Sequence, residues 1–316
     1  MKVVIAYDLG EGFIKDLRAS FPEVDFVVAY SEDEQFTHAS DVEVQFGLLT
    51  RQTFNAAENL KWYQFIGIGF DSELRKIPEL VDSSVVMTIC RETHVIPMAD
   101  HVFAMILSFS HCIPGLVADQ KERVWDANKW EITELAGTTM GILAMGDIGR
   151  AVARRAQGFD MAVYGIDIVG MPPPEGVRAV WGMECLDEVL QMSDWFVVTA
   201  PRTTQTQGLI DARCLRLMKN SAHLIVVSRG GIVDEPALIE ALSTGEISGA
   251  GIDAFATEPL PEDSQLWDMT NVLISPHSSA HSPQMWERRK NIFKDNLRRY
   301  IAGEPLQYVS DNKRGY

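Results

Sequence analysis

The chain alternates short apolar runs with amphipathic stretches. In its first part the runs, rich in β-branched and aromatic residues, cover residues 3–7, 24–30, 44–49, 62–69 and 85–89. A second series covers residues 139–145, 161–167, 195–200, 223–228, 249–254 and 271–276. Runs of this length separated by helical stretches are typical of parallel βαβ units. The pattern therefore predicts an α/β protein with two doubly wound parallel sheets, one after the other.

A longer helical pattern connects the two series. Residues 97–126 open with Pro97, which suits the first turn of a helix. They carry a spaced apolar stripe at Val102, Met105, Ile106 and Phe109. We expect Pro114 and Gly115 to interrupt this helix and its first part to bridge the two domains.

A second long helix is predicted near the C-terminus, over residues 283–303, with Gly303 as its end. Its expected apolar face comprises Trp286, Ile292, Phe293, Leu297 and Ile301. Because the second sheet is complete before this helix begins, we expect the helix to cross back to the first domain.

The charge balance narrows the possible partners. The 316 residues include 28 Lys and Arg against 44 Asp and Glu, a formal net charge of −16. Such a surface repels nucleic-acid phosphates and anionic lipid, so we expect neither nucleic acid nor membrane as a partner. A local basic pocket for a small anion stays open. The most apolar stretch, residues 98–109, is broken by Asp100 and His101 and is too short for a membrane span.

The cysteines and the N-terminus indicate a cytoplasmic protein. Cys90, Cys112, Cys185 and Cys214 form no C-x-x-C pair, which favours free thiols over a disulfide framework or a zinc site. The first apolar run ends before Asp8 and is too short for the core of a signal peptide.

A dinucleotide-binding turn follows the run at 139–145. Gly146 and Gly149 stand at the second and third glycine positions of a G-x-G-x-x-G turn, and Ala144 replaces the first. Gly146 would let the backbone approach a pyrophosphate at the start of a helix, where Asp147 and Ile148 also lie, and Gly149 would permit close packing of helix on strand. The Asp147 carboxylate suits a helix cap better than a contact with an anion.

Asp167, 18 positions after Gly149, ends the next predicted strand. An acid there can accept hydrogen bonds from the adenosine ribose hydroxyls and repels a 2′-phosphate. The cofactor expected is therefore NAD rather than NADP. A plain turn acid is the alternative interpretation of Asp167.

Three ionisable residues, Arg229, Glu258 and His277, follow predicted strands of the second sheet. Histidine suits proton transfer to and from a hydroxyl, a glutamate on its other nitrogen would fix the tautomer, and arginine can grip a carboxylate at two points. Taken singly, an arginine after a strand is usually part of a surface ion pair, and a histidine after a proline is usually a turn residue. His281 lies four residues after His277, but no adjacent acid completes a metal motif, so no metal is expected.

Several segments, which follow one another in a characteristic order along the chain, carry a resemblance to a known family. They are GIGFD at 67–71, PMADHV at 97–102, LAGTTMGILAMGDIGRAVARRA, SDWFVVTAPRTTQTQGLI, the block at 224–280 containing SRGGIVDE and SPHSSA, and the closing RGY. Together they resemble the D-isomer-specific 2-hydroxyacid dehydrogenases. The runs at 91–100 and 119–125 look like the subgroup that reduces glyoxylate, hydroxypyruvate and related 2-keto acids.

The resemblance implies roles for individual residues and a domain plan. Arg229 would bind the substrate carboxylate, His277 would be the acid/base and Glu258 its partner. The backbone N–H groups of Ile68 and Gly69 would hold the substrate carboxylate from the first domain. Cofactor contacts would come from Gly146, Asp147, Ile148, Gly149, Asp167, Pro201, Thr206, Ser228 and Asp253. Residues 1–97 plus 285–316 would form a flavodoxin-like substrate domain, and residues 98–284 a Rossmann domain, with a cleft between them and a homodimer built on the bridging helices.

The chain departs from the family pattern at Ala144, at Val226 in place of an asparagine, and at Arg202 in place of an apolar residue. Glu258 argues against the formate dehydrogenase branch, which has glutamine there. We also expect no regulatory domain of the long phosphoglycerate dehydrogenases. The expected activity is hydride transfer between NAD(H) and a small (2R)-2-hydroxy acid or its 2-keto acid. The alternative is a corepressor-like protein that senses dinucleotides on the same scaffold.

Overall fold

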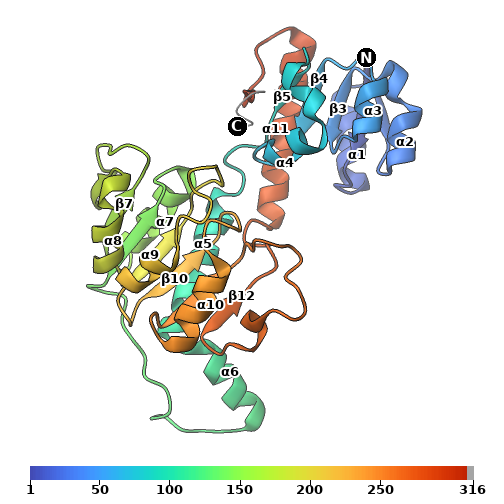
Figure 1. Ribbon diagram of the computed structural model, residues 1–316. Helices are drawn as coiled ribbons and strands as arrows, with labels where there is room; N and C mark the ends of the chain where they lie inside the picture. Colours follow the sequence, from blue (N-terminus) through green and yellow to red (C-terminus); the bar gives the residue numbers. More distant parts are fainter. Residues whose placement is uncertain (312–316) are drawn as a thin grey trace. The chain divides into compact units, whose positions relative to one another are not determined.

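The computed structural model describes residues 1–311, apart from the side chains of Asp71 and Ser72, and divides into two compact units (Figure 1). Unit 1 consists of Met1–His94 together with the described residues from Ser282 on, and unit 2 is Val95–His281. The closing RGY, at 314–316, lies outside the described residues. Each unit is built around its own parallel sheet, which confirms the predicted α/β fold class.

Unit 1 contains a five-stranded parallel sheet in the order β2-β1-β3-β4-β5. This is the flavodoxin-like strand order. The strands are β1 (Lys2–Ala6), β2 (Asp25–Val28), β3 (Val44–Gly47), β4 (Trp62–Phe65) and β5 (Val86–Thr88). The helices between them are α1 (Glu11–Ser20), α2 (Glu32–Thr37), α3 (Arg51–Ala56) and α4 (Asp71–Lys76), with 3₁₀ turns η1 (Ala39–Asp41) and η2 (Pro78–Asp82).

The C-terminal helix α11 (Pro283–Ala302) completes the core of unit 1. It begins at Ser282, whose hydroxyl accepts from the Met285 N–H, and ends at Gly303 in the left-handed conformation. The Phe293 ring stacks on Phe46 with the ring centroids 4.1 Å apart. The expected apolar face is partly wrong, because Ile301 is 42% exposed whereas Arg289 and Asn296 are buried.

Unit 2 contains a seven-stranded parallel sheet in the order β12-β11-β10-β9-β6-β7-β8. Counted from its first strand, β6, this is the Rossmann order with one further strand. The strands are β6 (Thr139–Leu143), β7 (Ala162–Ile166), β8 (Val177–Trp181), β9 (Trp195–Val198), β10 (His223–Val226), β11 (Gly249–Ile252) and β12 (Val272–Ile274). The edge strand β8 was not predicted, because its apolar run is broken by Arg178.

Helices cover both faces of the seven-stranded sheet (Figure 1). One core forms under α8 (Leu186–Met192), α9 (Ala212–Leu217) and α10 (Glu235–Thr244). The opposite core forms under α5 (Val95–Ser110) and α7 (Asp147–Gln157). The 3₁₀ turns η3 (Met183–Cys185) and η4 (Gln265–Asp268) also belong to this unit.

The stretch expected as one interrupted helix is two helices, α5 and α6 (Ile113–Glu122). The break lies at Cys112, which is left-handed at φ 51°, and Pro114 lies inside the first turn of α6. The predicted interruption at Pro114 and Gly115 was therefore misplaced, since proline is tolerated in a first turn. No single helix in residues 1–311 is long and apolar enough to cross a membrane. The pair α5 and α6, bent by 61° at the break between them, meets this requirement by length and composition alone.

The parallel order brings particular loops together. Strands β10, β11 and β12 are neighbours, so the loops after their carboxyl ends share one edge of the sheet. The chain order reverses between β6 and β9, and open α/β sheets bind ligands at such a reversal. The Thr199 hydroxyl after β9 donates to the Ala144 carbonyl after β6 at 2.8 Å, which ties these two loops together.

A histidine at the start of β10 makes unit 2 sensitive to acid. Burial lowers the pKa of His223 to about 4 from an ordinary value of 6.5. Its ring lies against Trp195 and Phe109, and among the described residues its Nδ1 has no hydrogen-bond partner. The unfolded chain therefore binds a proton between pH 6.5 and pH 4 that the folded chain does not, so stability falls as the pH falls through this range.

We expect the free energy of unfolding to fall by about 2 kcal/mol from this group between pH 7.5 and pH 5. His223→Phe should remove that part of the loss, because phenylalanine keeps the ring packing without a titrating nitrogen. Urea unfolding at the two pH values measures the effect. The exposed His111→Gln should behave as the wild type, and an equal pH dependence in all three proteins would contradict the assignment.

Candidate active site

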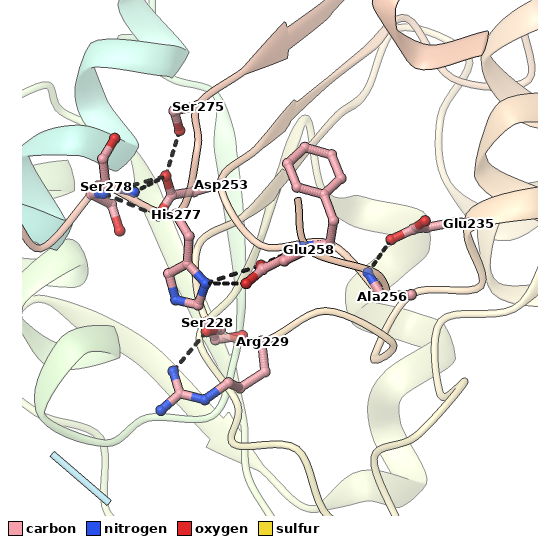
Figure 2. A network of polar contacts seen from close by, with 11 residues as sticks. Ser228, Arg229, Glu235, Asp253, Ala256, Glu258, Ser275, His277 and Ser278 are labelled. Atoms are coloured by element: carbon pink, nitrogen blue, oxygen red, sulfur yellow. Dashed lines mark hydrogen bonds and ion pairs between the residues drawn. The ribbon is translucent and has the colours of Figure 1, made fainter. Parts of the chain in front are cut away.

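A histidine and a glutamate from neighbouring loops form the centre of the site. The Nδ1 atom of His277, after β12, lies 2.9 Å from each carboxylate oxygen of Glu258, after β11 (Figure 2). A carboxylate only accepts hydrogen bonds, so Nδ1 carries the proton. The Nε2 atom is left facing outward, since the His277 side chain is partly exposed. The pair thus presents one imidazole nitrogen in a fixed tautomer.

The turn that carries His277 is held by a buried carboxylate. His277 is left-handed at φ 51°, an uncommon conformation for a residue with a side chain. The Asp253 carboxylate accepts from the Ser275 hydroxyl at 2.6 Å, the Ser278 N–H at 2.9 Å and the Ser279 N–H at 3.1 Å. These bonds flank His277 on both sides, so Asp253 fixes the turn in which the imidazole is presented.

The family resemblance implied a cofactor contact for Asp253, and nothing in the sequence indicated this turn-holding role. The Asp253 side chain is fully buried. The His101 ring on α5 extends the network, with its Nε2 at 2.9 Å from the Ser275 hydroxyl. Residues 101, 253 and 275 are far apart in the sequence, and no local pattern marks them as partners.

The Arg229 loop packs directly on the Glu258 loop. A Cβ atom at Gly230 would lie 1.7 Å from the Phe255 carbonyl oxygen, so only glycine permits this approach. The Phe255 N–H in turn donates to Glu258 Oε1 at 3.0 Å, and Glu235 accepts from the Ala256 N–H. Arg229 donates from Nη1 to the Ser228 carbonyl at 2.9 Å (Figure 2), and within the described residues no carboxylate pairs with it.

The turn after β6 has the features of an anion-binding turn. Gly146 is the cap residue of α7 and has no side chain that could accept from the first-turn N–H groups. A Cβ at Gly146 would meet nothing within 4 Å, so no packing inside the protein requires this glycine. A Cβ at Gly149 would lie 2.3 Å from the Ala144 carbonyl oxygen, which accounts for that glycine by close packing.

The other predicted cofactor residues lie in the loops that follow neighbouring strands. The Asp167 carboxylate accepts from the Met145 N–H and the Ile168 N–H, both at 2.8 Å. Thr206 donates to the Pro201 carbonyl at 2.7 Å and so holds its own loop. The Ser228 hydroxyl is buried without a hydrogen-bond partner among the described residues.

These residues fit a dinucleotide. A helix N-terminus whose cap residue is an unobstructed glycine suits a pyrophosphate, and the carboxylate at the end of β7 suits a ribose diol. The orphaned Ser228 hydroxyl is a buried polar group that a bound molecule can satisfy.

The last predicted site residues, Ile68 and Gly69, lie in unit 1 between β4 and α4. The Gly67 carbonyl accepts from the Cys90 N–H at 2.8 Å, which ties the loop to the end of β5. Within the described residues, the N–H groups of Ile68 and Gly69 have no acceptor. They are therefore available to an anion.

Comparison with known proteins identifies the family. The D-isomer specific 2-hydroxyacid dehydrogenase NAD binding domain matches residues 103–279. The chain belongs to the D-isomer specific 2-hydroxyacid dehydrogenase family.

Individual relatives differ in their named activities. The D-3-phosphoglycerate dehydrogenase of Bacillus subtilis is 33% identical over 89% of this chain and 51% of its own length. The glyoxylate reductase of Korarchaeum cryptofilum is 31% identical over 84% of this chain and 81% of its own length. The chain spans about half the length of the phosphoglycerate dehydrogenases that it matches.

Among solved structures, the D-isomer specific 2-hydroxyacid dehydrogenase of Xanthobacter autotrophicus Py2, in complex with NADPH and MES, has a TM-score of 0.83 at 30% identity. The match covers 100% of this chain and 99% of that one.

The alanine at the first fingerprint position is strained. Ala144 has φ 75°. Glycine adopts this left-handed conformation readily, whereas in alanine the Cβ atom is too close to the following carbonyl oxygen. We expect Ala144→Gly to raise the free energy of unfolding by about 0.5–1 kcal/mol, because the relieved strain exceeds the added entropy of the unfolded chain. Ala151→Gly, inside α7, should lower it by about 1 kcal/mol. Denaturant unfolding distinguishes the two, and equal losses in both variants would show that Ala144 is not strained.

Proposed function

We propose that this protein transfers a hydride between a nicotinamide cofactor and a (2R)-2-hydroxy acid or its 2-keto acid, and that it acts mainly as a 2-keto acid reductase. Family membership supports the reaction class. The observation that carries the proposal is the His277–Glu258 pair, in which a carboxylate fixes the tautomer and orientation of a partly exposed imidazole.

In the proposed reduction, the bound nicotinamide supplies the hydride. His277 donates the proton from Nε2 to the keto oxygen, and Glu258 stabilises the imidazolium from which that proton comes. Asp253 keeps the imidazole in place through the turn at 275–279. In oxidation the same nitrogen accepts the hydroxyl proton.

We assign the substrate carboxylate to Arg229 and to the N–H groups of Ile68 and Gly69. A guanidinium fork binds a carboxylate at two points, and Arg229 has no carboxylate partner in the described chain. The substrates proposed are glyoxylate, hydroxypyruvate and related 2-keto acids. The glyoxylate reductase of Korarchaeum cryptofilum is a relative that supports this choice.

The proposed cofactor preference is NAD over NADP. Asp167 places a negative carboxylate beside the turn after β6, where it would repel a 2′-phosphate. The Xanthobacter autotrophicus relative was solved with NADPH, so the preference is a property of individual members of the family.

We further propose that the protein is a homodimer and is cytoplasmic. The homodimer is supported by the apolar surface of α6 and the following loop, where Ile113, Leu116 and Val117 are exposed and Trp125 is 99% exposed. Apolar surface of this kind marks contact sites between proteins.

We expect His277→Ala to lower turnover with a reducible 2-keto acid by roughly 100-fold to 10,000-fold, because the proton donor is removed. Steady-state rates with NADH over a panel of 2-keto acids measure this. His111→Ala, a change at an exposed histidine, is the matched control and should retain wild-type turnover. Unchanged turnover in His277→Ala would refute its assignment as the acid, and tight NADH binding without any turnover would favour the sensing alternative.

We expect Asp167→Asn to lower the ratio of kcat/KM with NADH to that with NADPH by at least about tenfold, or about 1.4 kcal/mol. The amide keeps an oxygen for the Met145 N–H and removes the charge that repels a 2′-phosphate. Rates with both cofactors on one substrate give the ratio. A ratio equal to that of the wild type would remove Asp167 from cofactor selection.

A further inference from the structure

One arginine of α11 lies on the buried face of the helix. Arg289 is only 9% exposed, and among the described residues no other Lys or Arg is buried. Its burial lowers the pKa of the guanidinium, because removal from water disfavours the charged form. A buried cation is unfavourable unless an anion or several hydrogen bonds accompany it.

The protein itself supplies little compensation for this charge. Arg289 Nε lies 3.4 Å from the Thr93 hydroxyl, a long hydrogen bond, and its guanidinium carbon lies 4.9 Å from the centroid of the Trp286 ring. The ionisable groups close enough to affect its charge are Cys90 and Tyr7. Burial raises the pKa of the Cys90 thiol to about 12, so this thiol carries no negative charge at neutral pH.

Other arginines of the same helix are paired. Arg298 bonds Asp295 at 2.7 Å, and Arg288 donates twice to the Thr93 carbonyl, at 2.7 and 3.0 Å. Within the described residues, Arg289 has no carboxylate partner and no acceptor for Nη1 or Nη2. Neither nitrogen is fully buried, so both reach solvent. The open end of the guanidinium is therefore the accessible end.

Arg289 lies at the carboxyl edge of the unit 1 sheet, where ligands bind in open α/β sheets. Tyr7 directly follows β1, and its ring stacks on Trp286 with the centroids 5.5 Å apart. Cys90 follows β5; its N–H donates to the Gly67 carbonyl in the Ile68 loop, and its thiol donates to the Phe65 carbonyl at the end of β4. The guanidinium thus lies near the loop assigned above to the substrate carboxylate.

We propose that Arg289 binds a second anionic group of the substrate, a carboxylate or a phosphate remote from the 2-keto acid. The inference rests on the proposed function, in which the Ile68 and Gly69 N–H groups bind the first carboxylate. Nη1 and Nη2 form a planar fork that matches two oxygens of either anion. The Trp286 ring lies over the guanidinium, with the Tyr7 ring stacked on it. Among related 2-keto acids, those with two anionic groups are therefore the preferred substrates.

The test compares substrates with one and two anionic groups. Oxaloacetate and 2-ketoglutarate carry a second carboxylate, 3-phosphohydroxypyruvate carries a phosphate, and pyruvate and glyoxylate carry neither. In Arg289→Met we expect kcat/KM to fall about 100-fold for the dianionic acids that the wild type prefers and by less than about threefold for the others, because only the former lose a charge pair. The better of the two dianionic classes in the wild type identifies the group bound.

Two further variants serve as controls. Arg298→Met removes the same charge from an exposed position of α11 and should leave both substrate classes unchanged. Arg289→Lys keeps a charge without the fork and should recover part of the preference. Equal losses for both substrate classes in Arg289→Met, or a wild type without any preference for dianions, would overturn the proposal.

A binding measurement without turnover separates this proposal from the proposed function. Succinate and inorganic phosphate, as unreactive anions, should raise the melting temperature of the wild type and Arg298→Met, and one of them should do so much less in Arg289→Met. If no 2-keto acid is reduced but this difference is present, the proposed reaction fails and the anion site stands. If reduction is observed but the shift is the same in all variants, the anion site fails alone.

Discussion

The buried carboxylate of Asp253 is the constraint on which the candidate chemistry depends. It bonds the Ser275 hydroxyl and the N–H groups of Ser278 and Ser279, and so holds the turn in which His277 is left-handed. A buried carboxylate must satisfy its oxygens within the protein, and this turn supplies the donors. The position of the imidazole therefore follows from a group that is itself fully covered.

Much of the fold could be predicted from the period of the apolar residues. The runs at 44–49 and 223–228, for example, became β3 and β10, because parallel strands covered on both faces are nearly continuous in apolar residues. The edge strand β8 was missed, since an edge needs less burial and Arg178 interrupts its run. Helix faces were less predictable. Ile301 is exposed although the period of the helix predicts it on the apolar face, and Arg289 takes a buried position that periodicity would give to an apolar residue.

The candidate site was predictable only in part. The sequence predicted Glu258 as the partner of His277, and the adjacency of β11 and β12 explains why their two loops meet. Nothing local indicated that His101 and Ser275 contact each other or that Ser275 contacts Asp253, because these partners are more than twenty positions apart in the chain. The contact of Gly230 with the Phe255 carbonyl was likewise invisible, since a glycine in a loop is usually explained by a turn.

The return of α11 to unit 1 has a consequence for the order of assembly during synthesis. Unit 2 is contiguous, so all of its strands leave the ribosome before α11 does. The rings of Phe46 and Trp62, by contrast, cannot contact Phe293 until α11 has been synthesised. The nascent N-terminal sheet therefore presents an uncovered aromatic surface while the middle of the polypeptide is translated, and it is this interval that exposes the growing chain to aggregation and to chaperones.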